Sequence, residues 1–411
     1  MSLAATTIRV DVDLDPVRIG SRSGLLWSRD DFCLAGVGEA LRIPVSRPDG
    51  AAEALARLAE LRGADEVDRP GTGPVGFGAF PFDRSATGEL IVPEIVIGRG
   101  SEGRRWVSLI GDGPADLDVA VTRLREMGDR PVPRGSQPSD FRLTSVVAPE
   151  TWRDEIVAAA RERIERGELS KAVLARELVL TTELPIDEAL VIDRLLQSYR
   201  SSIVFAIDGF VGASPELLVS RLDDIVRAHP LAGTAPRSSD PAVDQRLSAG
   251  LLASDKDRWE HRITIDWLLD TLLPFCSYVD AEPEPTIVSL ANVHHLGTRV
   301  EGRLSAPAAS VLELVGALHP TPAVGGAPQG AALELIAELE QAERGRYAGP
   351  AGWVDATGNG AFAVSVRSAQ ISGCETRLFA GVGVVADSDP ESELAETRAK
   401  FQAMLGALIR P

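Results

Sequence analysis

The sequence predicts an α+β fold built on antiparallel sheets. Short apolar segments typical of strands recur along the chain, and helical patterns interrupt them at irregular intervals. One pair of segments is joined by Asp208-Gly209, a dipeptide typical of two-residue β-hairpin turns. A parallel βαβ fold would alternate strands with helices regularly, so the irregular order favours α+β.

The composition is that of an acidic globular protein. The chain has 411 residues, of which 44% are hydrophobic and 25% charged, and its formal net charge is −18. This length suffices for one large domain or two smaller ones. The acidic balance argues against a nucleic-acid surface and against docking on anionic lipid.

The sequence also lacks targeting and membrane signals. The start, MSLAATTIRVDVDLDPVR, has no basic segment followed by an apolar run, so we expect no signal peptide. No stretch approaches the roughly 18 apolar residues of a membrane-spanning helix. We therefore expect a cytoplasmic protein.

Residues 128–142, rich in Pro, Gly and Ser, read as a connection between two halves. Nearly all candidate catalytic residues follow this connection. The first predicted helix after it covers 152–169, and the strand 171–180 comes next. Asp187 is the expected N-cap of a helix over 187–199. Further helices are predicted at 242–273, 329–344 and 389–408, with strands near 286–303, 352–356, 361–371 and 376–386.

Two groups of charged residues are spaced to share a helical face. Asp257 and Glu260 are three residues apart in a predicted helix, so both point to one side. Glu393, Glu396 and Lys400 share a face of another helix. Carboxylates from two helices suit Mg²⁺, which prefers oxygen ligands and keeps positions open for water and substrate. The same spacing also fits solvated helix faces with an ordinary surface ion pair.

Lys171 and Glu216 are candidates for proton transfer. Lys171 opens an otherwise apolar strand, and a lysine can act as a general base only if burial or a positive neighbour favours its neutral form. Glu216 follows the predicted hairpin, and burial there would raise its pKa and let it act as an acid. Either residue could instead be an ordinary solvent-exposed side chain.

Tyr347 and Arg367 could clamp a carboxylate. Glycine clusters such as LAGTAPR, AVGGAP and AGVGVV would let backbone N–H groups approach an anion. None of these clusters matches a nucleotide-phosphate loop, which argues against a phosphate-handling magnesium enzyme. Taken singly, no feature decides the function.

Together these segments resemble the chorismate-utilising enzymes: isochorismate, salicylate, anthranilate and aminodeoxychorismate synthases. The resemblance covers residues 150–408 and rests on eight motifs in order: SKAVLAR, GASPE, HPLAGTAPR, LLASDKDRWEH, VHHLGT, LHPTPAVGGAP, ERGRYAGPAGW and GVGVVADSDPESELAETRAK. It implies one large α+β domain over 1–411, with two stacked antiparallel sheets and helices outside. Residues 1–140 would be the variable part of this scaffold, and the Pro-rich stretch would lie inside the domain.

The resemblance also implies a magnesium site. Glu260 and Glu396 would be the Mg²⁺ ligands, and Asp257 and Glu393 would hold metal-bound waters. The metal would grip the ring carboxylate of chorismate.

The remaining implied residues would contact the substrate. Tyr347 and Arg367 would hold chiefly the carboxylate of the enolpyruvyl arm, helped by Lys400 and the backbone amides of Gly381 and Gly383. Gly233 and Thr234 would lie against the chorismate ring, with His295 near its edge. Ala323 would also belong to the substrate-binding set.

The branch of the family follows from the chemistry of each member. Adding water at ring carbon 2 while hydroxide leaves carbon 4 requires a base and an acid, for which the resemblance offers Lys171 and Glu216. The anthranilate branch lacks the lysine, and the aminodeoxychorismate branch has a lysine where this chain has Ala232. Salicylate synthases share both residues but usually have threonine at the position of Ala323. The chain therefore resembles the isochorismate branch most, with a salicylate synthase as the alternative.

The isochorismate branch implies chorismate as the substrate and no amidotransferase subunit, and it favours a monomer. Its product feeds either menaquinone or siderophore synthesis. A non-catalytic relative should have lost part of the set Lys171, Glu216, Glu260, Glu396 and Arg367, yet all five are present.

Overall fold

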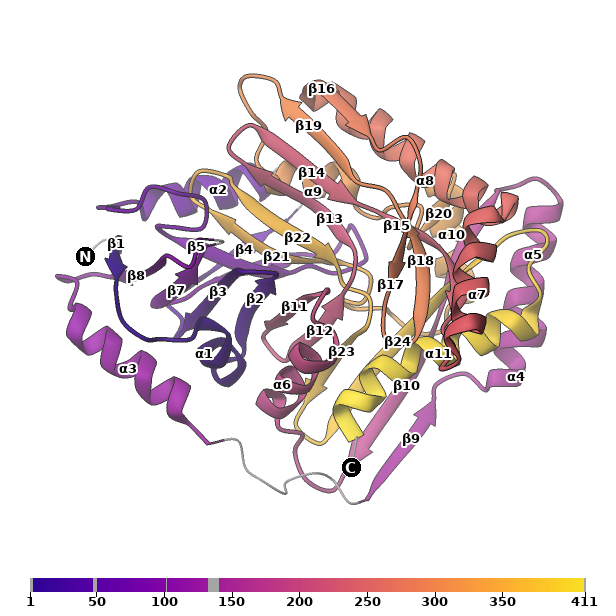
Figure 1. Ribbon diagram of the computed structural model, residues 1–411, viewed down its shortest axis with the longest axis horizontal. Helices are drawn as coiled ribbons and strands as arrows, with labels where there is room; N and C mark the ends of the chain where they lie inside the picture. The colour runs from indigo at the N-terminus through magenta and orange to yellow at the C-terminus, as the bar shows by residue number, and fades with distance from the viewer. Residues whose placement is uncertain (1–2, 47–49, 101, 132–139, 410–411) are drawn as a thin grey trace.

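The computed structural model describes residues 3–46, 50–100, 102–131 and 140–409. Within these ranges it contains a 12-stranded sheet, a 9-stranded sheet and a small 3-stranded sheet, with helices packed around them (Figure 1). Neighbouring strands of all three sheets pair antiparallel. The predicted α+β class with antiparallel sheets is confirmed.

The 12-stranded sheet is assembled from both halves of the chain. Its strands in spatial order are β1 (Ala4–Val10), β8 (Arg105–Gly111), β7 (Ile95–Arg99), β3 (Phe32–Val37), β2 (Leu25–Arg29), β11 (Ile203–Ile207), β12 (Phe210–Ser214), β23 (Ser368–Ser372), β24 (Glu375–Val384), β10 (Lys171–Thr182) and β20 (Gly326–Ala327), with β9 (Phe141–Ser145) also paired to β10.

The other two sheets include the strands that border the site. The 9-stranded sheet runs β16 (Cys276–Ala281), β19 (Val300–Leu304), β14 (Ile225–His229), β13 (Leu217–Leu222), β22 (Gly360–Val364), β21 (Pro350–Asp355), β5 (Val75–Ala79), β6 (Gly88–Val92) and β4 (Leu41–Val45). The 3-stranded sheet runs β15 (Leu231–Pro236), β18 (Val293–Gly297) and β17 (Thr286–Ser289). The predicted strand near 286–303 is therefore three strands.

The helices lie outside the two large sheets (Figure 1). They are α1 (Pro16–Ser23), α2 (Gly50–Glu60), α3 (Leu117–Asp129), α4 (Pro149–Thr151), α5 (Ala158–Glu165), α6 (Glu188–Ser198), α7 (Pro241–Ala253), α8 (Asp255–Leu272), α9 (Val311–Leu318), α10 (Gln329–Leu339) and α11 (Pro390–Ile409), with a π-helical turn (Trp152–Val157) and a 3₁₀ turn (Leu273–Phe275). No helix in the described ranges is long and apolar enough to cross a membrane.

Strand alternation explains how the 12-stranded sheet acquires two covered faces. In β11, Phe205 belongs to the core shared with the second sheet, where Phe77 and Phe362 also lie. Its neighbour Val204 points to the other face. There it belongs to a second core, which includes residues of the covering helices such as Met404 of α11. Successive side chains in a strand point to opposite faces, so a continuous apolar run such as IVFAI is buried on both sides.

The N-terminal segment completes both large sheets. Strands β4, β5 and β6 extend the 9-stranded sheet beside β21, and β1, β2, β3, β7 and β8 extend the 12-stranded one beside β11. Figure 1 shows these indigo-to-purple strands in the same sheets as the later orange and yellow ones. In the predicted connection at 128–142, α3 ends at Asp129 and β9 begins at Phe141, while 132–139 lie outside the described residues.

Two local predictions are confirmed. Asp208 and Gly209 have φ values of 54° and 72°, as expected for the turn residues of a two-residue hairpin, and β11 pairs with β12 across them. Asp187 caps α6, because its side chain accepts the N–H groups of Ala189 and Leu190.

Two predicted helices are shorter than expected. The helix predicted at 242–273 is divided at Ser254, an extended residue whose side chain caps α8 by accepting the Asp257 N–H at 3.2 Å. The helix predicted at 329–344 ends at Leu339, because Glu340 adopts an extended ψ of 125°. The first break places Asp257 in the first turn of α8. The second takes the segment around Arg344 out of the helix.

Candidate active site

A cavity of about 320 Å³ lies between α8, α11, the strands β10 and β24, and the small sheet. Every residue that the sequence assigned to the site lines this one cavity: Lys171, Glu216, Gly233, Thr234, Asp257, Glu260, His295, Ala323, Tyr347, Arg367, Gly381, Gly383, Glu393, Glu396 and Lys400. Segments separated by more than two hundred residues are thus brought together.

Helix α8 forms one wall. The Ser254 cap starts the helix so that Asp257 and Glu260 lie in its first turns and face the cavity. Gly233 approaches this wall with a φ of +73°, and a Cβ there would lie 3.2 Å from the Asp257 side chain. A residue other than glycine at 233 would therefore be strained and crowded.

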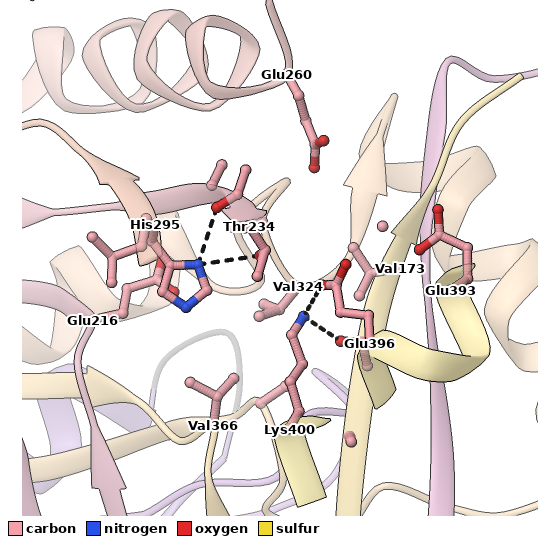
Figure 2. A pocket seen from close by; sticks show the side chains of 18 of the residues that line it. Val173, Glu216, Thr234, Glu260, His295, Val324, Val366, Glu393, Glu396 and Lys400 are labelled. Carbon is pink, nitrogen blue, oxygen red and sulfur yellow. Dashed lines mark hydrogen bonds and ion pairs between the residues drawn. The ribbon is translucent and has the colours of Figure 1, made fainter. Parts of the chain in front are cut away.

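Helix α11 forms the opposite wall. Figure 2 shows Glu260 reaching in from one side, and Glu393, Glu396 and Lys400 from the other. Lys400 Nζ donates to Glu396 Oε1 at 2.7 Å and to the carbonyl oxygen of Gly381 at 2.8 Å. Burial and the nearby charge of Glu396 raise the pKa of Glu393 to about 7. At neutral pH Lys400 therefore balances the charge of Glu396, while Glu393 is present in both protonated and ionised forms.

Lys171 opens strand β10 and is only 2% exposed. Its Nζ contacts Glu260 Oε1 at 2.5 Å. Burial alone would raise the pKa of Glu260, but Lys171 and then Lys400 and Lys256 outweigh it, so this pKa is lowered. A Cβ at Gly383 would lie 2.7 Å from the Lys171 side chain, which explains the glycine at this position of β24.

Glu216 lies between β12 and β13 and is 5% exposed. Burial raises its pKa to about 7, partly opposed by a hydrogen bond from the Leu231 backbone and by the charge of Lys171. At neutral pH this carboxyl is therefore present in both protonated and ionised forms, as a general acid requires.

Arg367 and His295 form a buried hydrogen-bonded pair. Arg367 Nη2 donates to His295 Nε2 at 2.7 Å, and His295 Nδ1 lies 3.0 Å from the carbonyl oxygen of Gly233. A guanidinium only donates and a carbonyl only accepts, so Nδ1 carries the proton of a neutral imidazole. Burial and Arg367 lower the pKa of His295 well below its usual value, in agreement with this tautomer.

Arg367 has the features of a residue held for a ligand. Its Nε is buried and has no hydrogen-bond partner, and burial lowers its pKa only to about 10, so it stays charged at neutral pH. Its φ of 52° lies in the left-handed region, which costs a non-glycine residue about 1–2 kcal/mol. A buried cation with an unmatched donor is suited to a carboxylate.

A hydroxyl group and two backbone N–H groups border the same space. Burial raises the pKa of Tyr347 to about 12, so its hydroxyl remains protonated, and its ring stacks on Phe379 at 5.3 Å between centroids. The Gly381 carbonyl bonds to Lys400 and so points away from β10. In an antiparallel strand, the N–H groups of Gly381 and Gly383 share this direction.

The residues present fit a magnesium ion, although they do not form a closed cage. Asp257, Glu260, Glu393 and Glu396 supply only oxygen donors. The pKa of Glu393 is raised by burial and then by repulsion from Glu396, and a cation would relieve that repulsion. Among the described residues, no group of three or more His, Cys, Asp or Glu side chains could hold a metal ion as placed. Mg²⁺ commonly binds through one or two carboxylates plus water and substrate, which suits this arrangement.

Sequence reasoning missed several residues of the cavity wall, among them Val173, Lys256 and Arg344. For Lys256 a signal existed. The chain has only three lysines against a combined 42 lysines and arginines, and all three lysines line the cavity. Lysine is thus confined to the site in a protein that uses arginine elsewhere.

Comparison with known proteins identifies the family of the chain. The sequence profile of a family described as "Chorismate binding enzyme" matches residues 17–409. Isochorismate synthase DhbC of Bacillus subtilis (strain 168) is 38% identical over 346 residues, covering 82% of this chain and 81% of that protein. The vibriobactin-specific isochorismate synthase of Vibrio cholerae is 37% identical over 348 residues, covering 84% and 80%.

The fold agrees as well. The structure of MenF, the menaquinone-specific isochorismate synthase from Escherichia coli, superposes with a TM-score of 0.82 at 27% identity, covering 99% of this chain and 95% of that chain. The profile match spans nearly the whole sequence, and the similarity to these relatives extends over most of their length. The chain therefore belongs to the chorismate-binding enzyme family, and its place within that family is among the isochorismate synthases.

Proposed function

We propose that this enzyme converts chorismate to isochorismate by adding water at ring carbon 2 and expelling the hydroxyl group from carbon 4. The observation that carries the proposal is the joint burial of Lys171 and Glu216 in one cavity with a carboxylate-rich wall and an anion-binding arginine. Proton acceptor, proton donor and substrate anchors are thus all within one small space.

Chorismate is a dianion, and the cavity offers matching donors. The unpartnered Nε of Arg367 and the Tyr347 hydroxyl would hold the carboxylate of the enolpyruvyl arm, with Lys400 and the N–H groups of Gly381 and Gly383 assisting. His295 would fix the guanidinium plane and, with Gly233 and Thr234, border the ring. These contacts orient the ring for attack.

Lys171 would take a proton from the attacking water, and Glu216 would give its proton to the departing hydroxyl, which leaves as water. Lys171, which pairs with Glu260 in the structure, would enter the step as the neutral amine and Glu216 as the acid. Lys171 gains one proton and Glu216 loses one, so the total number of protons in the site is unchanged. Ala323 would leave space for isochorismate to depart before its pyruvate is eliminated.

Magnesium is the proposed cofactor, held by Glu260 and Glu396, with Asp257 and Glu393 binding water around it. When bound, it supplies positive charge that offsets and orients the ring carboxylate of the substrate. Each proposed ligand carboxylate also has a lysine partner in the structure, Lys171 for Glu260 and Lys400 for Glu396.

The chain would work as one catalytic domain spanning 1–411, because the N-terminal strands complete both large sheets. We further propose a monomer that needs no ammonia-supplying subunit. Menaquinone and siderophore synthesis are both compatible destinations for the product.

The activity should depend on pH through Glu216. Its pKa is raised to about 7, so the acid form predominates below that pH and falls tenfold per unit above it. We expect kcat/KM, which reports the free enzyme, to decline above about pH 7 with a slope approaching −1. Glu216→Gln should remove this limb and lower kcat by about 10²–10⁴-fold. An alkaline limb that persists in Glu216→Gln would assign it to another group.

The proposed function is tested by incubating the purified protein with chorismate, with and without Mg²⁺, and separating the products by chromatography. Isochorismate formed only with Mg²⁺ supports the proposal. Salicylate together with pyruvate would instead identify a salicylate synthase and show that Ala323 does not protect the intermediate.

A further inference from the structure

We infer that Arg344, clamped by Glu340, is a positioning residue that holds three separate segments of the cavity wall in register for the reaction. The inference rests on the proposed function, since the segments it joins carry Lys171, Ala323 and Tyr347. Neither Arg344 nor Glu340 belongs to the set of residues that bind substrate or metal in that proposal.

The pair is buried and bidentate. The Arg344 and Glu340 side chains are 3% and 8% exposed, and Arg344 donates from Nε to Oε2 at 2.8 Å and from Nη2 to Oε1 at 2.5 Å. The guanidinium also lies 4.2 Å from the centroid of the Phe82 ring. This combination of contacts fixes the plane of the guanidinium.

The first segment held by the pair is the strand that carries Lys171. The outer edge of β10 pairs with β20 at Lys171 and Ala172, and with β9 only from Leu178 onward. Between these two partners, Arg344 Nη2 donates to the carbonyl of Val173 at 2.6 Å, and Glu340 Oε1 accepts the N–H of Ala175 at 2.7 Å. The two side chains therefore take the place of a missing strand just beyond Lys171.

The second segment bonds to the same guanidinium, and the third bonds to the backbone of the same residue. Arg344 Nη1 donates to the carbonyl of Val324 at 2.9 Å, which fixes the loop that presents Ala323 to the cavity. The backbone carbonyl of Arg344 accepts the Tyr347 N–H at 3.0 Å. One residue thus sets the separation between the proposed base, the Ala323 loop and a proposed substrate donor.

The donors of Arg344 are too fully occupied for a substrate-binding role. Of the five N–H groups of a guanidinium, four are used by Glu340, Val173 and Val324. Arg367 differs, because its Nε has no partner and is available to an anion. Arg344 therefore acts through the segments it joins.

Lysine cannot replace this arginine, because one ammonium cannot reach three acceptors that diverge around a planar fork. For Arg344→Lys we expect kcat to fall about 10–100-fold, since small misplacements of reacting groups have effects of that size, while KM changes less than about threefold. Arg346→Lys is the matched control. Arg346 lies two residues away and contacts Ile207 and Asp208 outside the cavity, so its kcat should match the wild type.

The experiment measures kcat and KM per folded protein, at a temperature well below the Tm of each variant. Glu340→Gln, which keeps the size of the side chain but weakens the clamp, serves as the second variant and should show the same loss in kcat. Wild-type kcat in both variants, even with a lowered Tm, would contradict the inference. The Arg344–Glu340 pair would then have a purely structural role. A KM increase with kcat unchanged would overturn the inference in favour of direct substrate binding.

Failure of the proposed function is separable from failure of this inference. If the wild type forms no isochorismate from chorismate, the function itself is wrong. If the wild type is active and Arg344→Lys turns over equally fast, only the positioning role is wrong.

Discussion

Glu260→Gln is expected to lose magnesium-dependent isochorismate formation, with kcat/KM at least about 10³-fold below wild type. Such a factor corresponds to about 4 kcal/mol, within the several kcal/mol that a metal ion supplies to developing charge. The amide of glutamine has no charge to hold Mg²⁺. Glu396 would then be the only proposed ligand left, and its carboxylate is already paired with Lys400. Calorimetric titration with Mg²⁺ and chromatographic product analysis measure the two effects separately.

The fold should survive this substitution. Glutamine still offers an oxygen to Lys171, although weakening a buried charge pair costs up to about 3–5 kcal/mol. Globular proteins have free energies of unfolding of about 5–15 kcal/mol, so most molecules of the variant should stay folded. Circular dichroism can verify this. Glu391→Gln is the matched control, because Glu391 lies on the exposed face of α11 and pairs with Arg153. Full activity of Glu260→Gln with bound metal would contradict the ligand assignment.

Lys171→Ala is expected to stop water addition while chorismate still binds. Loss of a general base commonly lowers the rate by about 10²–10⁴-fold. Lys400, which also lines the cavity, is bonded to Glu396 and to the Gly381 carbonyl. Because Lys171 pairs with Glu260 in the structure, its removal should leave Mg²⁺ affinity intact or increase it. Rapid-quench turnover and equilibrium binding of chorismate and Mg²⁺ check these outcomes.

Lys171→Arg separates the proton-transfer role from the charge. Arginine keeps a cation beside Glu260 but remains protonated at any pH at which the enzyme folds, so it cannot accept a proton. We expect Lys171→Arg to be as inactive as Lys171→Ala. Recovery of turnover in Lys171→Arg would mean that Lys171 contributes only positive charge.

Much of the local structure follows from the sequence. The Asp208-Gly209 turn and the Asp187 cap were predictable because their conformations depend on residues only a few positions apart. The break at Ser254 departs from the prediction of one continuous helix, although serine is a typical N-cap residue and caps α8 here. The early end of α10 was not foreseeable, because Glu340 leaves the helix to reach Ala175, far away in the sequence.

The predicted site residues come from ordered motifs, and all of them line one cavity. Their pairing was not predictable. Nothing in the spacing of Lys171 and Glu260, or of His295 and Arg367, indicates that each pair is in contact. Likewise, Arg344 and Arg346 occur in one motif, yet one is buried at the cavity wall and the other contacts the Asp208 turn.

The sequence by itself determined the fold class, the family and the chemical types of the site residues, because composition, short-range pattern and motif order are properties of the chain alone. Only the tertiary structure decided which charges are buried together, and therefore that Glu216 and Glu393 have pKa values near 7 and that Arg367 keeps an unmatched donor. The physical reason is that desolvation depends on burial and charge–charge interaction on distance. Both are determined by residues that are remote in sequence and meet only in the folded protein.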